Sequence, residues 1–284
     1  MLRSLRPAPL SALALGALLS ATTACHDRGA TAPDRPAPPR ETTLIAAAGG
    51  KSAANDVLLV QAISAALGGG SARSLSLRPT APRGAPSMDI TYGGLDCTYN
   101  SSRSLFECPQ VTLESMTIRA EFALYDASKN PQSAYDDVTT TSATVWYWAW
   151  GTLVNPPGGA TIDRQRTLTV DNLQSGASER VFGGGGTDVS NGTLPDDATK
   201  TFVLHDTTTA AGVAVGVPFS ANVWPLRGTL TTNSQLDIAQ GGSTISTTHR
   251  RVVITFNGTQ FVPMDVDGTV YTLDLGTGDL TPNP

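Results

Sequence analysis

The 284-residue chain is poor in charged residues, aromatic residues and cysteine. Only 15% of its residues are charged, 6% are aromatic, and it has 3 Cys and 3 His. Threonine is instead abundant from Thr112 onward, which is typical of β proteins rather than helical bundles or coiled coils. Nucleic-acid binding is not expected, because 19 Lys+Arg against 24 Asp+Glu give a net charge of −5 and no basic run occurs. The 40% of apolar residues is too high for a disordered chain.

The N-terminus has the layout of a secretory signal. Arg3 and Arg6 precede an apolar stretch at residues 10–19, which is far shorter than the ~20 residues of a membrane-spanning helix. Small residues follow at 20–24, and then Cys25. These features predict export of the chain.

The run that ends in Cys25 resembles the lipobox of bacterial lipoprotein signal peptides. The resemblance implies cleavage after residue 24 and a palmitate-type lipid anchor on Cys25. It also favours the outer membrane over the inner one, because His26 stands where an Asp tends to retain such proteins at the inner membrane. An ordinary secretory signal cut after Ala24, leaving a free thiol, is the alternative.

Loss of residues 1–25 removes two arginines and no acid, so the net charge changes from −5 to −7. Attraction to anionic headgroups is therefore not expected, and contact with the membrane would depend on the lipid anchor. Residues 26–41 are rich in Pro and Ala and have no apolar periodicity, which predicts an extended tether.

A helical segment is predicted at residues 42–70, with its clearest part at 55–67. Asn55 is expected to cap this helix, and glycines at 68–70 to end it. The polar side is expected to carry Asp56, Gln61 and Ser64, without Lys or Arg, so the helix should pack on a sheet rather than lie on a membrane. The expected apolar stripe consists of Leu58, Leu59, Ala62, Ile63, Ala66 and Leu67. A second linker, rich in Arg, Ser and Pro, is expected at residues 71–87.

Residues 88–284 are predicted to form one mainly antiparallel β domain. Ten to twelve β-rich runs alternate with turn residues, without the helices of a βαβ pattern. We therefore expect a single β-sandwich or a partly open barrel, with one N-terminal amphipathic helix. The last runs, at 251–256, 260–264 and 270–275, are joined by Asn257-Gly258 and Asp267-Gly268, which predict hairpin turns and a three-stranded meander. Gly183 to Gly186 is interpreted as a flexible loop.

Cys97 and Cys108 enclose ten residues that include turn formers. In an exported protein this spacing predicts a disulfide across a hairpin, and loop closure would stabilise the fold by roughly 3 kcal/mol. A metal site is the rival interpretation, but zinc needs three or four ligands and the chain supplies few other cysteines or histidines. No metal and no cofactor are predicted.

No catalytic motif is recognisable, so the sequence favours a protein without enzymatic activity. His205 and Asp206 are neighbours and would point to opposite faces of a strand, which makes them a poor base and orienting acid. Asp265 and Asp267 superficially resemble a calcium loop, but Gly268 comes too early for that pattern and fits a turn.

Three of the four tryptophans lie within five residues, in the segment Trp146-Tyr147-Trp148-Ala149-Trp150. On a strand, the three tryptophans share one face and Tyr147 points to the other. If the tryptophan face is internal, it fills the core, which is the favoured interpretation. If it lines a ligand surface, its rings suit sugars or an apolar ligand, with Trp146, Tyr147, Trp148 and Trp150 as candidates.

Three functions follow as hypotheses. The preferred one is a lipid-anchored protein of the cell envelope that binds an apolar ligand or a partner, or has a structural role, with a curled sheet closed by the helix as its carrier-like variant. The second is a secreted β-fold hydrolase or carbohydrate-active protein that uses the Trp146–Trp150 stripe. The third is a surface adhesin. The sequence does not identify a protein partner.

Overall fold

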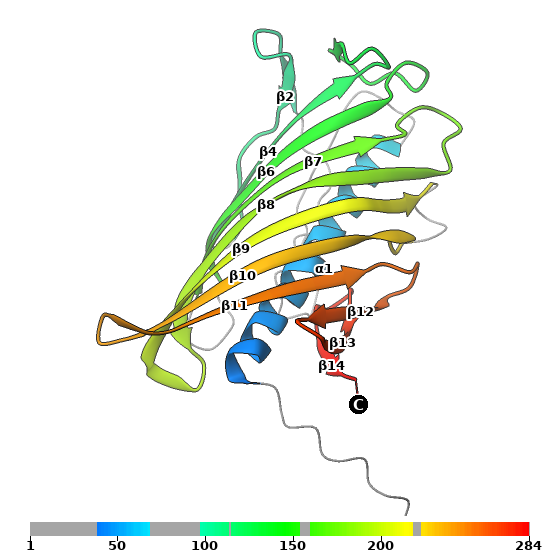
Figure 1. The fold of residues 1–284 in the computed structure, drawn as a ribbon. Helices are drawn as coiled ribbons and strands as arrows, with labels where there is room; N and C mark the ends of the chain where they lie inside the picture. The colour runs from blue at the N-terminus through cyan, green and yellow to red at the C-terminus, as the bar shows by residue number, and fades with distance from the viewer. Residues whose placement is uncertain (1–38, 69–96, 114, 154–159, 218–222, 284) are drawn as a thin grey trace, which may run out of the picture. The chain divides into compact units, whose positions relative to one another are not determined.

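A single antiparallel sheet of 14 strands dominates the computed structural model, and it does not close on itself (Figure 1). The structure describes residues 39–68, 97–113, 115–153, 160–217 and 223–283. The predicted signal segment, nearly all of the tether and the linker at 71–87 lie outside these ranges. The prediction of a mainly β, antiparallel fold with one N-terminal helix is confirmed, and the sandwich alternative is replaced by one continuous sheet.

The strands follow one another in the sheet almost in chain order. The path is β1-β2-β4-β6-β7-β8-β9-β10-β11-β12-β13-β14, and β3 and β5 both pair with β4. The strand bounds are β1 (Thr98–Asn100), β2 (Leu105–Glu107), β3 (Val111–Leu113), β4 (Met116–Tyr125), β5 (Pro131–Gln132), β6 (Ser142–Leu153), β7 (Ala160–Asp171), β8 (Glu179–Leu194), β9 (Asp197–Gly216), β10 (Arg227–Gln240), β11 (Ser243–Thr255), β12 (Phe261–Val266), β13 (Thr269–Asp274) and β14 (Leu280–Pro282).

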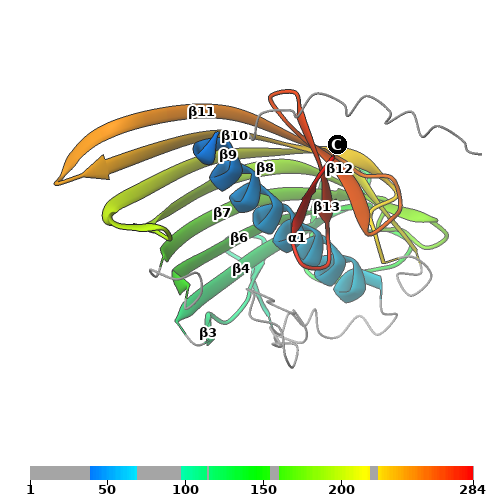
Figure 2. The same cartoon turned by 90° about the horizontal axis from the view of Figure 1, so that it is seen from below.

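Helix α1 (Arg40–Gly68) crosses one face of this sheet, and strands β12–β14 lie beside it (Figure 2). The helix starts well before Asn55, so the prediction that Asn55 caps it is wrong. Gly49 and Gly50 lie within this helix, where it packs against the C-terminal strands. An added Cβ would lie 3.4 Å from Met264 at Gly49 and 2.9 Å from the Gly278 carbonyl oxygen at Gly50. These two glycines therefore let the helix approach the C-terminal strands closely.

The helix is buried on more than the predicted stripe. Ile45, Val57, Leu59 and Ile63 are each at most 3% exposed and contribute to the main hydrophobic core. Asp56 and Ser64, expected on a solvated polar side, are also buried. The helix thus lies between the long strands of the sheet and its C-terminal strands β12–β14. Its buried polar groups therefore need hydrogen-bond partners inside the protein.

Strand β7 shows how each strand divides its side chains between two faces. Its residues alternate strictly between buried and exposed, beginning with buried Ala160. The inner face, toward the helix, carries residues such as Leu168 and Val170, whereas the outer face carries Thr167 and other polar side chains. This alternation is what a sheet with one covered face requires.

Gly183 to Gly186 lie inside strand β8, so their interpretation as a flexible loop is wrong. The backbone here is packed so closely against the neighbouring strands that a Cβ would overlap with a carbonyl oxygen. The overlap would involve the Gln165 oxygen at Gly186 and the Thr208 oxygen at Gly185. The register also shifts between Phe182 and Gly184. Glycine therefore permits an irregular, tightly packed stretch of strand opposite the helix.

The C-terminal meander of β11, β12 and β13 is present. Asp267 and Gly268 form a two-residue turn with φ of 48° and 86°, as expected for a type I′ hairpin. Asn257-Gly258, in contrast, belongs to a longer connection in which only Gly258 has positive φ.

The disulfide prediction is confirmed. Strands β1 and β2 form an antiparallel hairpin in which Thr98 pairs with Glu107, so Cys97 and Cys108 are the next pair along the ladder. They are linked by a disulfide with a Cα–Cα distance of 4.0 Å. The neighbouring Phe106 stacks on Phe122 of β4 with ring centroids 4.6 Å apart, which ties the hairpin to the sheet.

Candidate functional site

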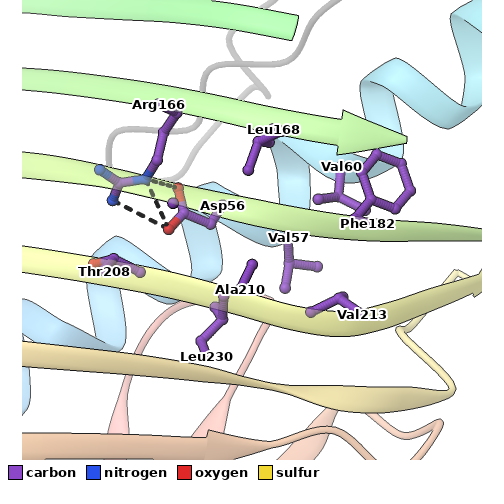
Figure 3. Close-up of a pocket in the computed structure, with 11 residues that line it drawn as sticks. Asp56, Val57, Val60, Arg166, Leu168, Phe182, Thr208, Ala210, Val213 and Leu230 are labelled. Atoms are coloured by element: carbon purple, nitrogen blue, oxygen red, sulfur yellow. Dashed lines mark hydrogen bonds and ion pairs between the residues drawn. The ribbon is translucent and has the colours of Figure 1, made fainter. Parts of the chain in front are cut away.

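A buried cluster of charged and polar side chains joins helix α1 to the inner face of the sheet. Asp56 of the helix accepts a hydrogen bond from Arg166 Nε of β7 at 3.0 Å (Figure 3). Arg166 Nη1 also donates to Asp188 Oδ1 of β8 at 2.7 Å, and Arg164 Nε donates to the same oxygen at 3.0 Å. Ser52 of the helix donates to Asp188 Oδ2 at 2.9 Å. Two arginines and two carboxylates are thus neutralised inside the protein.

The charges in this cluster are held in their ionised forms. Burial alone would raise the pKa of Asp188, but Arg164 and Arg166 outweigh it and lower this pKa to about 2. Burial would likewise lower the pKa of Arg166, but Asp56 and Asp188 raise it. The Asp188 carboxylate and the Arg166 guanidinium therefore keep their charges near neutral pH. This is typical of a structural ion cluster rather than of a proton-transfer site.

Asp206 of β9 is the exception beside this cluster. It is the register partner of Asp188, and its Oδ1 atom has no hydrogen-bond partner in the described structure. Burial raises the pKa of Asp206 to about 6, against the opposing hydrogen bond from Ser234. The inner face therefore holds one carboxyl group whose charge is poorly compensated.

A small cavity lies between the helix and strands β7–β10, next to Asp56 and Arg166 (Figure 3). Its volume of about 20 Å³ is room for about one water molecule. Its apolar walls include Val57, Phe182 and Leu230. The helix side chains thus occupy the space in which the carrier-like variant would hold an apolar ligand.

The three clustered tryptophans lie on the outer face of the sheet, opposite the helix. Trp146 and Trp148 are half-buried and Trp150 is 38% exposed. Tyr147 and Ala149 point inward and are each 3% exposed. The interpretation of the tryptophans as core residues is therefore wrong, whereas Tyr147 belongs to the core and not to a ligand surface.

Polar side chains flank this tryptophan stripe on both neighbouring strands. On β4, the residues opposite the tryptophans are Thr117, Arg119 and Glu121. On β7, they are Asp163, Gln165 and Thr167. The Arg119 guanidinium lies 5.3 Å from the centre of the Trp148 ring, a cation–π contact. The stripe is thus a row of aromatic rings between two rows of hydrogen-bonding groups.

Glu121 is fixed by two arginines at the edge of the stripe. Arg103 Nη2 donates to it at 2.9 Å, and Arg119 forms a second ion pair with it. Burial would raise the pKa of Glu121, but the hydrogen bonds from Arg103 and Arg119 lower it. This carboxylate stays ionised, so it is unsuited to act as a general acid.

Two carboxylates lie close together at the edge of the stripe, since Glu107 of β2 is the register partner of Glu121 of β4, but Arg103 forms an ion pair with both of them. The acids directly opposite the rings are a wider pair, with Glu121 opposite Trp146 and Asp163 opposite Trp150. Strand spacing and rise put their Cα atoms roughly 16 Å apart. Glycosidases need about 5–9.5 Å between the two carboxyl groups, and Glu121 is already bound to arginines. Of these two acid pairs, one is bridged by an arginine and the other is too widely separated for this chemistry.

His205 and His249 also lie on the outer face, on β9 and β11, and both are exposed. As expected, Asp206 points to the opposite, inner face. Gln235 of β10 is the register partner of both histidines and separates them. Within the described ranges, no three His, Cys, Asp or Glu side chains are placed to share a metal ion.

Sequence reasoning missed the buried cluster of Arg164, Arg166, Asp188 and Asp206. One signal was available, since Arg164 and Arg166 share the alternating face of β7 with Ile162, Leu168 and Val170. Charged residues in an otherwise apolar register indicate buried partners.

The comparisons supply no relative from which a role could be transferred: no protein-family model, curated protein or solved structure matches the chain. None of the helices in the described residues is long and apolar enough to cross a membrane.

Proposed function

We propose that this chain is a lipid-anchored protein of the bacterial cell envelope that binds carbohydrate, without catalysis, through the outer face of its sheet. The observation that carries the binding role is the tryptophan stripe, defined as Trp146, Trp148 and Trp150, which faces outward beside two polar strands. A globular protein normally buries such large apolar rings. A row of them on the outer face is therefore expected to have a ligand.

The geometry of the stripe suits an extended sugar chain. Residues two apart on a strand are about 6.8 Å apart, so the three rings form a platform along β6. Indole rings offer flat apolar faces for the C–H groups of a pyranose. Gln165, Thr167 and Thr117 would supply hydrogen bonds to the hydroxyl groups on either side. Specificity for one sugar would depend on these polar neighbours.

The proposed anchor is the acylated thiol of Cys25, followed by the tether predicted at residues 26–41, of which Arg40 and Glu41 belong to helix α1. The disulfide between Cys97 and Cys108 supports an oxidising compartment, because such bonds are rare in the cytosol of mesophiles. Acyl chains on Cys25 would keep the sheet close to the bilayer surface and leave its outer face open to glycans of the envelope.

The binding role is tested by titrating cellohexaose, chitohexaose and mannohexaose into the purified protein while tryptophan fluorescence is recorded. We expect one of these probes to shift the emission, and Trp150→Ala to weaken its binding at least tenfold. Phe261→Ala is the matched control, because Phe261 is an exposed aromatic residue on a different strand, at 57% exposure. Equal binding by Trp150→Ala and the wild type, or no binding of any probe, would overturn the proposed role.

The anchor is tested separately by mass spectrometry of the protein extracted from its native membrane. An acylated N-terminal peptide that starts at Cys25 is expected, and Cys25→Ser should move the protein to the soluble fraction. A native N-terminal peptide that begins at Cys25 with a free thiol would instead indicate an ordinary secretory signal.

A further inference from the structure

Strands β9, β10 and β11 lie side by side in the sheet (Figure 1). A second hollow lies across them on the outer face. It has a volume of about 470 Å³, within the usual range for small-molecule sites. Asp267, in the β12–β13 turn, is part of its wall. Strands β7 and β8 separate this hollow from the tryptophan stripe on β6, so the two features are independent.

The floor of the hollow is a grid of side chains from two neighbouring rows of the sheet. His205, Gln235 and His249 form one row across the three strands, as the strand register requires. Thr207, Asn233 and Arg251 form the next row. Neighbouring strands are about 4.8 Å apart, so six polar side chains lie within reach of one small ligand.

The acidic residues near this grid already have partners. Asp237 Oδ1 accepts a hydrogen bond from Thr247 at 2.6 Å, and its Oδ2 accepts one from Gln235 at 2.8 Å. Asp267 Oδ1 accepts the backbone N–H of Arg251 at 3.1 Å, and its Oδ2 is 3.7 Å from Arg250. The Arg251 guanidinium, in contrast, forms no ion pair with any residue that the structure describes.

We infer that this hollow binds a small ligand that carries an oxyanion, either a phosphate or a carboxylate group. The planar guanidinium of Arg251 can donate two parallel hydrogen bonds to such a group. Asn233 and Thr207 add neutral donors in the same row, and the imidazoles of His205 and His249 add donors in the next. A soluble metabolite or a phospholipid headgroup would present the same chemistry.

The test uses the full chain carrying Cys25→Ser, so that no lipid anchor contributes. Calorimetric titrations are made with inorganic phosphate and with citrate, and flotation is measured with phosphatidylcholine vesicles with and without phosphatidylglycerol. Binding of phosphate or citrate would indicate a soluble ligand. Binding only to the vesicles that contain phosphatidylglycerol would indicate a headgroup.

In either case, Arg251→Gln is expected to weaken binding at least tenfold, and Asn233→Ala to weaken it to a smaller extent. Arg227→Gln, which removes another exposed arginine from β10, is the charge-matched control and should bind as the wild type does. Trp150→Ala should also leave this binding unchanged. A failure of the carbohydrate proposal can therefore be distinguished from a failure of the oxyanion proposal. If no probe binds, or if Arg251→Gln binds as tightly as the wild type, the inference is overturned.

Discussion

Asp206 lies directly opposite Asp188 in the pairing of strands β8 and β9, and both carboxyl groups are buried on the inner face. Only Asp188 receives hydrogen bonds from Arg164 and Arg166. The charge of Asp188 is therefore balanced by two arginines, whereas the charge of the neighbouring Asp206 is not. Both lie where helix α1 is hydrogen-bonded to the sheet.

This asymmetry predicts an unusual dependence of stability on pH. Because the pKa of Asp206 rises from 3.8 to about 6 on folding, the folded state holds this proton more tightly. The contribution of Asp206 is fully present below pH 3.8 and is lost as the pH rises through about 6. Asp206→Asn should therefore be more stable than the wild type above pH 6, by up to about 3 kcal/mol, with a smaller difference near pH 4.

Urea unfolding between pH 4 and 8 measures this effect. Asp163→Asn is the control, because Asp163 is an exposed residue on the outer face of β7. Parallel stability curves for Asp206→Asn and the wild type would contradict the role given to Asp206.

Removal of the helix carboxylate should loosen the helix. In Asp56→Asn, Arg166 loses a charged partner while it remains buried, and breaking a buried ion pair typically costs about 3–5 kcal/mol. Hydrogen exchange should become faster along α1, and urea unfolding should shift to lower concentration. Asn55→Ala, at the preceding residue, should change stability little because Asn55 caps no helix. A loss of stability comparable to that of Asp56→Asn would argue against the role of the Asp56–Arg166 ion pair.

The glycine run in β8 should tolerate a methyl group at one position and not at another. Gly186→Ala would drive a Cβ into the Gln165 carbonyl oxygen, and overpacking of this kind costs about 1–3 kcal/mol. At Gly183, the nearest atom to an added Cβ is Thr169 Oγ1 at 3.2 Å, which belongs to a side chain that can rotate. Thermal unfolding should show a clearly lower Tm for Gly186→Ala than for Gly183→Ala, and equal values would refute this packing argument.

The paired glycines of helix α1 should respond in opposite directions. Gly49→Ala improves helix propensity, and its Cβ would meet Met264 and Val252 at ordinary van der Waals distances of 3.4 Å or more, so a gain of about 0.5–1 kcal/mol is expected. Gly50→Ala would place its Cβ 2.9 Å from the Gly278 carbonyl oxygen, and we expect a net loss. Unfolding in urea distinguishes the two, and a stabilised Gly50→Ala would show that the C-terminal strands can move away.

Local patterns in the sequence predicted the local features of the fold. Asp267-Gly268 specified its turn because few dipeptides accept two successive positive φ angles. Cys97 and Cys108 specified their bond because the chain between them can form a hairpin. The antiparallel class followed from short β-rich runs without intervening helices.

Features that depend on distant partners could not be predicted in this way. The tight packing at Gly50 depends on the C-terminal strands, which are far away in the sequence. Asp56 resembles a solvated residue until Arg166, 110 positions away, is placed beside it. The outward direction of the tryptophan stripe depends on which face the helix covers, and alternation along one strand does not determine that.

The open sheet also bears on how copies of this protein behave when crowded at a surface. Exposed strand edges are templates for fibre growth. In the described part of the chain, the two ends of the sheet are β1 and β14, each three residues long, and β14 ends in Pro282, which has no N–H to donate. Strand β11 (Ser243–Thr255) differs, because it pairs with β12 only at Val252–Ile254, which leaves the edge of residues 243–250 unpaired in the described structure. We therefore expect edge-to-edge contacts between crowded copies to form along β11 rather than at β1 or β14.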